Sequence, residues 1–126
     1  MTTQPYRRSP QDIRERTFEF ACRIVRLHQY LHKKGGTQRA IGAQVLDSGT
    51  SIGANLEEAN AGQTKRDFIA ICSISLKEAR ETYFWLRVLL ATDLVPAERL
   101  KPLLIESHEI VSILTAIVKN AKENTP

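Results

Sequence analysis

Four polar side chains recur at helical spacing in the middle of the chain and could form a reactive centre. They are Ser48, Ser51, Asn55 and Glu58. Steps of three, four and three residues place them on one face of a helix. A serine nucleophile needs a general base within reach and donors for an oxyanion, and none of the three histidines lies in this segment. We therefore expect hydrogen bonds across a helix–helix contact instead, with Glu58 pairing with Lys65 or Arg66.

The histidines do not fit the metal site of a di-iron bundle, which requires a Glu-x-x-His motif. The residues three positions before His28, His32 and His108 are Val25, Gln29 and Ile105. His28 and His32 stand four residues apart and could share a metal, but no carboxylate or thiolate joins them on that face. We predict no metal site, no cofactor and no enzymatic activity.

Two rows of basic side chains are better candidates for function, because phosphates favour such rows and aromatic rings among them can stack on unpaired bases. One row consists of Arg66, Lys77, Arg80 and Arg87, with Phe84 among them. The other consists of Arg16, Arg23, Arg26 and Lys33, with Tyr30 among them. The predicted nucleic-acid contacts are Arg16, Arg23, Arg26, Lys77, Arg80 and Arg87, with Phe84 or Tyr30 stacking. The alternative is a solvated face, neutralised by Glu19, Glu81 and the acids of residues 96–122.

Four helical segments must position these residues. Apolar side chains repeat at steps of three and four through residues 10–34, 37–60, 65–91 and 96–122. The predicted start signals are Ser9 with Pro10, Thr37, Thr64 with Asp67, and Pro96, and the predicted breaks are Gly35–Gly36 and Ala61–Gln63. Because the connections are short, neighbouring helices must run antiparallel. The predicted fold is all-α, an up-down-up-down four-helix bundle in a single domain of residues 1–126.

Glycines on the second segment predict a close approach by another element. Gly42, Gly49 and Gly53 fall on one flank of that helix. Each glycine costs about 1 kcal/mol relative to alanine inside a helix, so a compensating contact is expected. We predict that Gly49 and Gly53 form a groove for large residues of a neighbouring helix or subunit.

The chain has more apolar surface than one bundle needs. The last segment alone has a predicted core line of Leu100, Leu104, Val111, Leu114 and Val118. Additional apolar or weakly polar residues lie off the main core lines of the first and third segments, at Phe18, Val25 and His32 and at Ile71, Ile74 and Trp85. Exposed patches of this kind usually mark partner surfaces. We expect self-association, with Gly49, Gly53, Asn55, Glu58 and Trp85 as packing and assembly residues.

Composition agrees with a cytoplasmic domain. The 126 residues are 42% apolar and 25% charged, with a net charge of +4. The first residues contain no apolar signal region, and no run approaches the ~18 uncharged residues of a membrane span. The two cysteines, Cys22 and Cys72, form no CxxC motif and fit a reducing compartment. The basic balance permits a nucleic-acid partner without requiring one.

The central motif resembles a bacterial family of four-helix bundle proteins first associated with intervening sequences in 23S ribosomal RNA genes. The matching residues are Ser51, Ile52, Ala54, Asn55, Glu58, Asp67, Phe68, Ile69, Ser75, Leu76 and Glu78. Ala59 stands where that pattern usually has glycine, which affects how the helix ends. The resemblance implies a ring-like or barrel-shaped homopentamer. Similar proteins accompany diversity-generating retroelements, where a basic barrel assists a reverse transcriptase and binds nucleic acid. The resemblance transfers no catalytic residue.

Two functions remain open from the sequence. The first is a non-enzymatic, cytoplasmic homo-oligomer, expected to be a pentamer, that binds RNA or DNA as a ribonucleoprotein accessory. The second is a scaffold that recruits a partner protein and makes no direct contact with nucleic acid. Neither involves a membrane.

Overall fold

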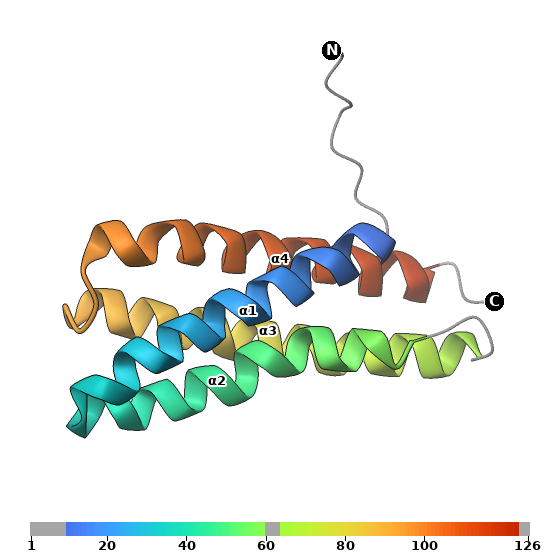
Figure 1. The fold of residues 1–126 in the computed structure, drawn as a ribbon. Coiled ribbons are helices and arrows are strands. Elements are labelled where there is room, and N and C mark those ends of the chain that lie inside the picture. Colours follow the sequence, from blue (N-terminus) through green and yellow to red (C-terminus); the bar gives the residue numbers. More distant parts are fainter. Residues whose placement is uncertain (1–9, 60–63, 124–126) are drawn as a thin grey trace, which may run out of the picture.

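Four helices make up the described part of the chain, and no strand occurs in it (Figure 1). The structure is a computed structural model that describes residues 10–59 and 64–123. The helices are α1 (Pro10–Lys34), α2 (Gly36–Glu57), α3 (Lys65–Ala91) and α4 (Ala97–Glu123). The predicted all-α four-helix bundle is confirmed. The predicted cap at Ser9 and the predicted break at Ala61–Gln63 lie outside the described residues.

The helices are arranged so that each packs on its neighbours in the sequence, and α1 also reaches α4 (Figure 1). Contact between α1 and α4 is the least extensive of these pairings. Figure 1 shows why: α1 begins beside the C-terminal half of α4 and crosses over toward the N-terminal end of α2.

Helix α2 starts and ends earlier than the sequence predicts. The predicted cap at Thr37 is wrong, because the helix begins at Gly36 and Gly35 takes the N-cap position without a side-chain hydrogen bond. Gly35 and Gly36 have φ of 75° and 53°, in the left-handed region that glycine adopts without strain. Two such residues reverse the chain so tightly that Thr37 already lies inside the helix. At the other end, Glu58 follows the last helical residue as the C-cap.

The starts of α3 and α4 agree closely with the sequence. The backbone N–H of Asp67 donates to Thr64 Oγ1 at 3.1 Å, which confirms the predicted cap of α3. Pro96 directly precedes α4, and its carbonyl accepts from the N–H groups of Arg99 and Leu100. Pro102 lies inside α4, where it removes one backbone donor close to the helix start.

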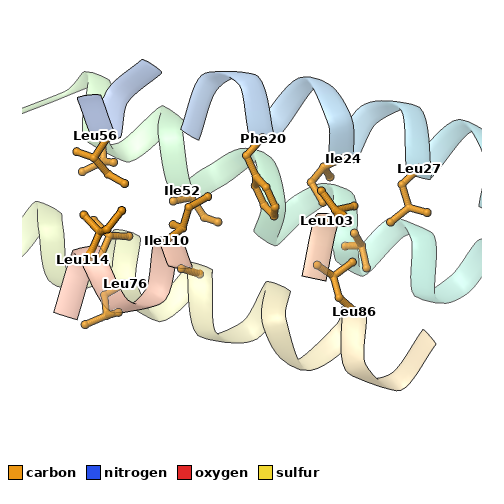
Figure 2. Close-up of a cluster of buried hydrophobic side chains, with 14 of the residues drawn as sticks. Phe20, Ile24, Leu27, Ile52, Leu56, Leu76, Leu86, Leu103, Ile110 and Leu114 are labelled. Atoms are coloured by element: carbon orange, nitrogen blue, oxygen red, sulfur yellow. The ribbon is translucent and has the colours of Figure 1, made fainter. Parts of the chain in front are cut away.

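The core is a continuous set of mainly aliphatic side chains, with Phe20 and Cys72, contributed by all four helices and by Val95 of the α3–α4 connection (Figure 2). Figure 2 shows Phe20, Ile24, Leu27, Ile52, Leu56, Leu76, Leu86, Leu103, Ile110 and Leu114 converging between the ribbons. The core line of α4 differs from the prediction: Leu103 and Ile110 are buried, whereas Leu104 and Val111 are only partly buried. Leu100, Leu114 and Val118 are buried as predicted, so the buried face of α4 is broader than the expected line and includes its Leu103 flank.

The glycine flank of α2 packs against α1. A Cβ added at Gly49 would lie 2.8 Å from Cγ1 and Cγ2 of Ile24, and one at Gly42 would lie 3.0 Å from Cβ of Leu31. A Cβ at Gly53 would lie 3.2 Å from the backbone oxygen of Thr17. The predicted groove is therefore occupied by the neighbouring helix of the same chain, α1.

Hydroxyl groups join α2 to α3. Ser48 and Thr82 are both fully buried and share a hydrogen bond of 2.9 Å. Ser75 Oγ donates to the carbonyl of Ile52 at 2.6 Å. The prediction of polar contacts across a seam holds for Ser48 but not for the next two members of the stripe. Ser51 Oγ donates to the Asp47 carbonyl and Asn55 Nδ2 to the Ser51 carbonyl, so both bonds stay within α2.

Candidate nucleic-acid interface

The basic row of α3 lies on the outer surface of the bundle. Its members are Arg66, Lys77, Arg80 and Arg87, and all four side chains are exposed. Phe84 lies among them and is 50% exposed. Its ring meets that of Trp85 edge-on, with centroids 5.2 Å apart, which fixes its orientation. Within residues 10–59 and 64–123, no carboxylate comes within ion-pair distance of these four cations.

The basic row of α1 is divided by its contacts with α4. Arg16 is largely covered and forms a two-pronged ion pair with Glu106, at 2.9 Å and 2.6 Å, and a further ion pair with Glu109 at 3.1 Å. Glu106 and Glu109 of α4 therefore neutralise Arg16. For this residue the alternative prediction holds, in which acids of residues 96–122 pair with the basic rows. This geometry leaves Arg16 unsuited to the phosphate contact predicted for it.

Arg23 and Arg26 lie further along α1, beside Arg99 of α4, which belongs to neither predicted basic row. They line a hollow of about 170 Å³ between α1 and α4, together with Leu27, Leu103 and Arg99. Arg99 comes from the first turn of α4. Its approach to α1 follows from the antiparallel bundle, because the start of α4 lies at the same end as the last turns of α1. Pro96, which places Arg99 in that first turn, was the available sequence signal.

Tyr30 is partly buried and packs against the core rather than facing solvent. The guanidinium carbon of Arg99 lies 4.3 Å from the centre of its ring, and the Lys34 ammonium lies 5.1 Å from it. The ring thus holds a cation of the protein itself by a cation–π contact. Base stacking on Tyr30 would require Arg99 to move, so Phe84 is the better placed aromatic.

Apolar side chains are exposed on both sides of α2. Phe18 of α1 is 66% exposed and lines a hollow of about 210 Å³ with Ala21, Thr50, Gly53 and Ala54 and with the charged Arg14 and Glu57. On α3, Ile74 is 49% exposed and shares a flank with Trp85, whose Nε1 donates to Glu81 at 3.2 Å. The expected exposure of Phe18 and Ile74 is thus found.

A cluster of carboxylates accompanies the Ile74 flank. Burial raises the pKa of Glu78 above its usual value, and the negative charges of Glu81 and Asp47 raise it further, while Lys77 acts in the opposite sense. Asp47 belongs to α2, so this flank of α3 adjoins α2.

The histidines and cysteines show no arrangement for chemistry. The rings of His28 and His32 lie 5.6 Å apart, and the described residues contain no group of three His, Cys, Asp or Glu side chains that could hold a metal ion. His108 of α4 lies against Tyr83 of α3, with ring centroids 5.3 Å apart, and both line an open hollow of about 600 Å³. Ser112 there donates to the backbone carbonyl of His108 rather than to an imidazole nitrogen. Burial raises the pKa of the Cys72 thiol, which keeps it protonated.

None of the described helices has the length and apolar character needed to cross a membrane.

The fold and its surface define an antiparallel four-helix bundle with an unneutralised basic face. The chain belongs to the family described as "23S rRNA-intervening sequence protein", whose sequence profile it matches over residues 10–116. A similar solved structure is a protein of unknown function from the S23 ribosomal protein family of Bacteroides thetaiotaomicron. It is 38% identical, with a TM-score of 0.78, over 87% of this chain and 97% of that one. No curated protein matches the chain.

Proposed function

We propose that this protein is a cytoplasmic, non-enzymatic homo-oligomer that binds nucleic acid as an accessory of a ribonucleoprotein. The observation that carries the proposal is the row on α3: Lys77, Arg80 and Arg87 flank the half-exposed Phe84 on one face, Arg66 continues the row toward the helix start, and none of the four forms an ion pair with a described carboxylate. Proteins that bind single strands combine such a positive track with aromatic rings on which bases stack. The name of the matched family supports the same direction.

The spacing of the row fits an extended strand. Lys77, Arg80 and Arg87 repeat at steps of three and seven, so they lie along one face of α3 over about 15 Å of helix axis. A single strand laid along this face would meet several cations through its phosphates and Phe84 through one base. Because every base has a π face, such binding tolerates many sequences.

Assembly would multiply this surface. The apolar flanks on either side of α2 support self-association, and we propose a ring, in which the α3 rows of successive subunits would repeat around the axis. Several weak sites on one particle bind a strand far more tightly than one site does, because later contacts form at high effective concentration.

The decisive test replaces Lys77, Arg80 and Arg87 together by glutamate. Binding of a labelled single-stranded RNA, followed by fluorescence anisotropy over a range of salt concentrations, is expected to weaken at least ~10-fold. The slope of log affinity against log salt is expected to become shallower by about 2, since each lost phosphate contact on a single strand contributes roughly 0.7. The matched control carries the same charge change at the exposed residues Lys101, Lys119 and Lys122 of α4 and is expected to retain binding. Equal affinities for wild type and triple variant would exclude the α3 face.

A second function is favoured by the exposed apolar residues, which could recruit a partner protein. Phe18 and Ile105 are each 66% exposed. A pull-down from nuclease-treated lysate separates the two functions, because a partner protein stays bound after nucleic acid has been digested, whereas a ribonucleoprotein is released.

A further inference from the structure

The seam between α1 and α4 changes its charge pattern along its length. Near the start of α1, Arg16 meets two carboxylates of α4, Glu106 and Glu109. Two turns further along α1, Arg23 and Arg26 share a hollow with another arginine, Arg99. Opposite charges therefore face each other at one end of the seam, and three like charges gather at the other.

The three guanidinium groups have no counter-ion among the residues that the structure describes. None forms an ion pair within the described residues. The nearest carboxylate on the same flank of α1 by helical position is that of Glu19, one turn before Arg23, and it remains exposed and outside ion-pair distance. Glu106 is already engaged by Arg16. Like charges brought together across a helix contact repel one another, so this end of the seam favours a bound anion.

The hollow has the size for a small chemical group, and one of its arginines is held in place by an aromatic ring. Its volume of about 170 Å³ is below the ~300 Å³ at which pockets for small molecules begin, so it suits a single group rather than a whole nucleotide. Leu27 and Leu103 form its apolar wall, and the Tyr30 ring holds Arg99 in place at 4.3 Å. Planar guanidinium groups match the geometry of phosphate oxygens through paired hydrogen bonds.

We propose that the hollow formed by Arg23, Arg26 and Arg99 between α1 and α4 is a phosphate-binding site that takes one phosphate group of a nucleic-acid strand. This inference rests on the proposed function and adds to it a second contact point. The site is separate from the α3 row, because α1 and α3 are not neighbours in the bundle and each contacts α2 and α4 instead. The two surfaces can therefore be tested independently.

The test uses Arg23→Gln/Arg99→Gln, with Lys101→Gln as the matched control for the loss of an exposed cation from the same end of α4. Circular dichroism first establishes that each variant is folded. The first measurement is the rise in Tm caused by inorganic phosphate relative to chloride at matched ionic strength, since a ligand of the native state stabilises it. Wild type and Lys101→Gln are expected to show the rise in Tm. The double variant is expected to show a much smaller rise, because losing charge-assisted hydrogen bonds should weaken its affinity for phosphate at least ~10-fold. An equal response in all three proteins would overturn the proposal.

The second measurement compares 5′-phosphorylated and 5′-hydroxyl forms of one single-stranded oligonucleotide. Tighter binding of the phosphorylated form by wild type, lost in the double variant, assigns the hollow to a terminal phosphate. Equal affinity for both forms, with both weakened in the double variant, assigns it to an internal phosphodiester. If the double variant binds both forms as wild type does, the nucleic-acid role of the hollow is overturned.

The α3 triple variant separates this inference from the proposed function. It is expected to lose affinity for RNA while keeping the Tm response to inorganic phosphate. If wild type binds no RNA while its phosphate response depends on Arg99, the proposed function and the assignment to a strand both fail, and the hollow stands as a site for free phosphate. If RNA binding depends on the α3 row and neither measurement depends on Arg99, the proposed function stands and this inference fails.

Discussion

Single hydroxyl groups fix how α2 and α3 meet. Ser48, Ser75 and Thr82 are fully buried, yet each has a hydrogen-bond partner, which offsets the cost of removing a polar group from water. Ser107 of α4 is equally buried, and the structure shows no hydrogen-bond partner for its hydroxyl among the described residues. The buried hydroxyls between α2 and α3 have hydrogen-bond partners, whereas that of Ser107 has none among the described residues. The α2–α3 contact is therefore the better place to measure how much one such hydrogen bond contributes to the free energy of unfolding.

At this residue scale, Thr82→Val is expected to destabilise the protein by about 1–3 kcal/mol, because it leaves the buried Ser48 hydroxyl without its partner. The double variant Ser48→Ala/Thr82→Val removes both polar groups and is expected to recover most of that loss. Urea unfolding of the two single variants and the double variant gives the coupling free energy. Additive losses would show that the two hydroxyls do not act as a pair.

Glu78 predicts a pH dependence with a defined sign. Its pKa in the folded protein is raised above the ordinary 4.5, chiefly by burial and then by Glu81 and Asp47, so the folded state holds this proton more tightly than the unfolded state. The stability linked to this group is fully present below the unfolded pKa and is lost as pH rises through the folded pKa. Glu78→Gln is therefore expected to raise Tm at neutral pH, with the gain over wild type shrinking toward pH 4.5. A gain that stays constant across this range would contradict the linkage.

At the scale of the elements, the α1–α2 contact is the most extensive in the bundle. It depends on Gly42, Gly49 and Gly53, where α1 lies so near that a Cβ would meet Leu31, Ile24 or Thr17. Ile24 contributes branched atoms close to its own backbone, and such a side chain cannot swing aside easily. The glycines are therefore steric requirements of packing rather than breaks in the helix.

Gly49→Ala tests that requirement. In an open helix the change would stabilise by about 1 kcal/mol, but here it is expected to destabilise by about 1–3 kcal/mol because the new methyl meets Ile24 at 2.8 Å. Ile24→Ala, which opens space opposite Gly49, is expected to make the same substitution favourable. Thermal unfolding of wild type, the two single variants and the double variant provides the comparison. Ala43→Gly, on the exposed face of α2, is the control that measures helix propensity alone. A stabilising effect of Gly49→Ala in the wild-type background would refute the steric explanation.

The elements were predictable to the extent that local spacing determines them. Phe20 and Ile24 repeat with the helical period and are core residues, and the Thr64 cap forms as its sequence indicates. In α4 the run Leu103, Leu104 and Ile105 is apolar on several faces, so periodicity could not tell which face turns inward. The partner of Arg16 lies 90 residues away, and no local pattern reveals such a pairing. Arg99 joined the candidate site for the same reason, through packing between distant segments.

At the scale of the whole molecule, two apolar flanks border the exposed face of α2, which carries small residues at Ala40, Ala43 and Ala54. Phe18 lies on one side and Ile74 on the other. The exposed Asp47 lies in the same line as these alanines. The small residues allow close approach of another helical surface, and the two apolar flanks offer it area to bury. We propose that subunits associate through this α2-centred face.

If subunits associate in this way, Phe18→Glu and Ile74→Glu are each expected to dissociate the proposed oligomer, because the new charge would lie in a contact that excludes water. Light scattering coupled to size-exclusion chromatography measures the mass of each variant. Ile105→Glu is the matched control, since Ile105 is as exposed as Phe18 but lies on α4. A wild type that is monomeric at micromolar concentration would exclude self-association, and dissociation by Ile105→Glu alone would move the contact to α4.

Trp85 is the only tryptophan of the chain, and its position makes it a built-in optical reporter. Its ring touches Phe84 of the basic row on one side, and its N–H is bonded to Glu81 on the Ile74 flank on the other. Strand binding at Phe84 and subunit contact at Ile74 would therefore each alter the surroundings of the same fluorophore. The emission of Trp85 can be followed without any label. A change on adding a nucleic-acid strand would report binding at Phe84, and a change on diluting the protein alone would report dissociation of subunits.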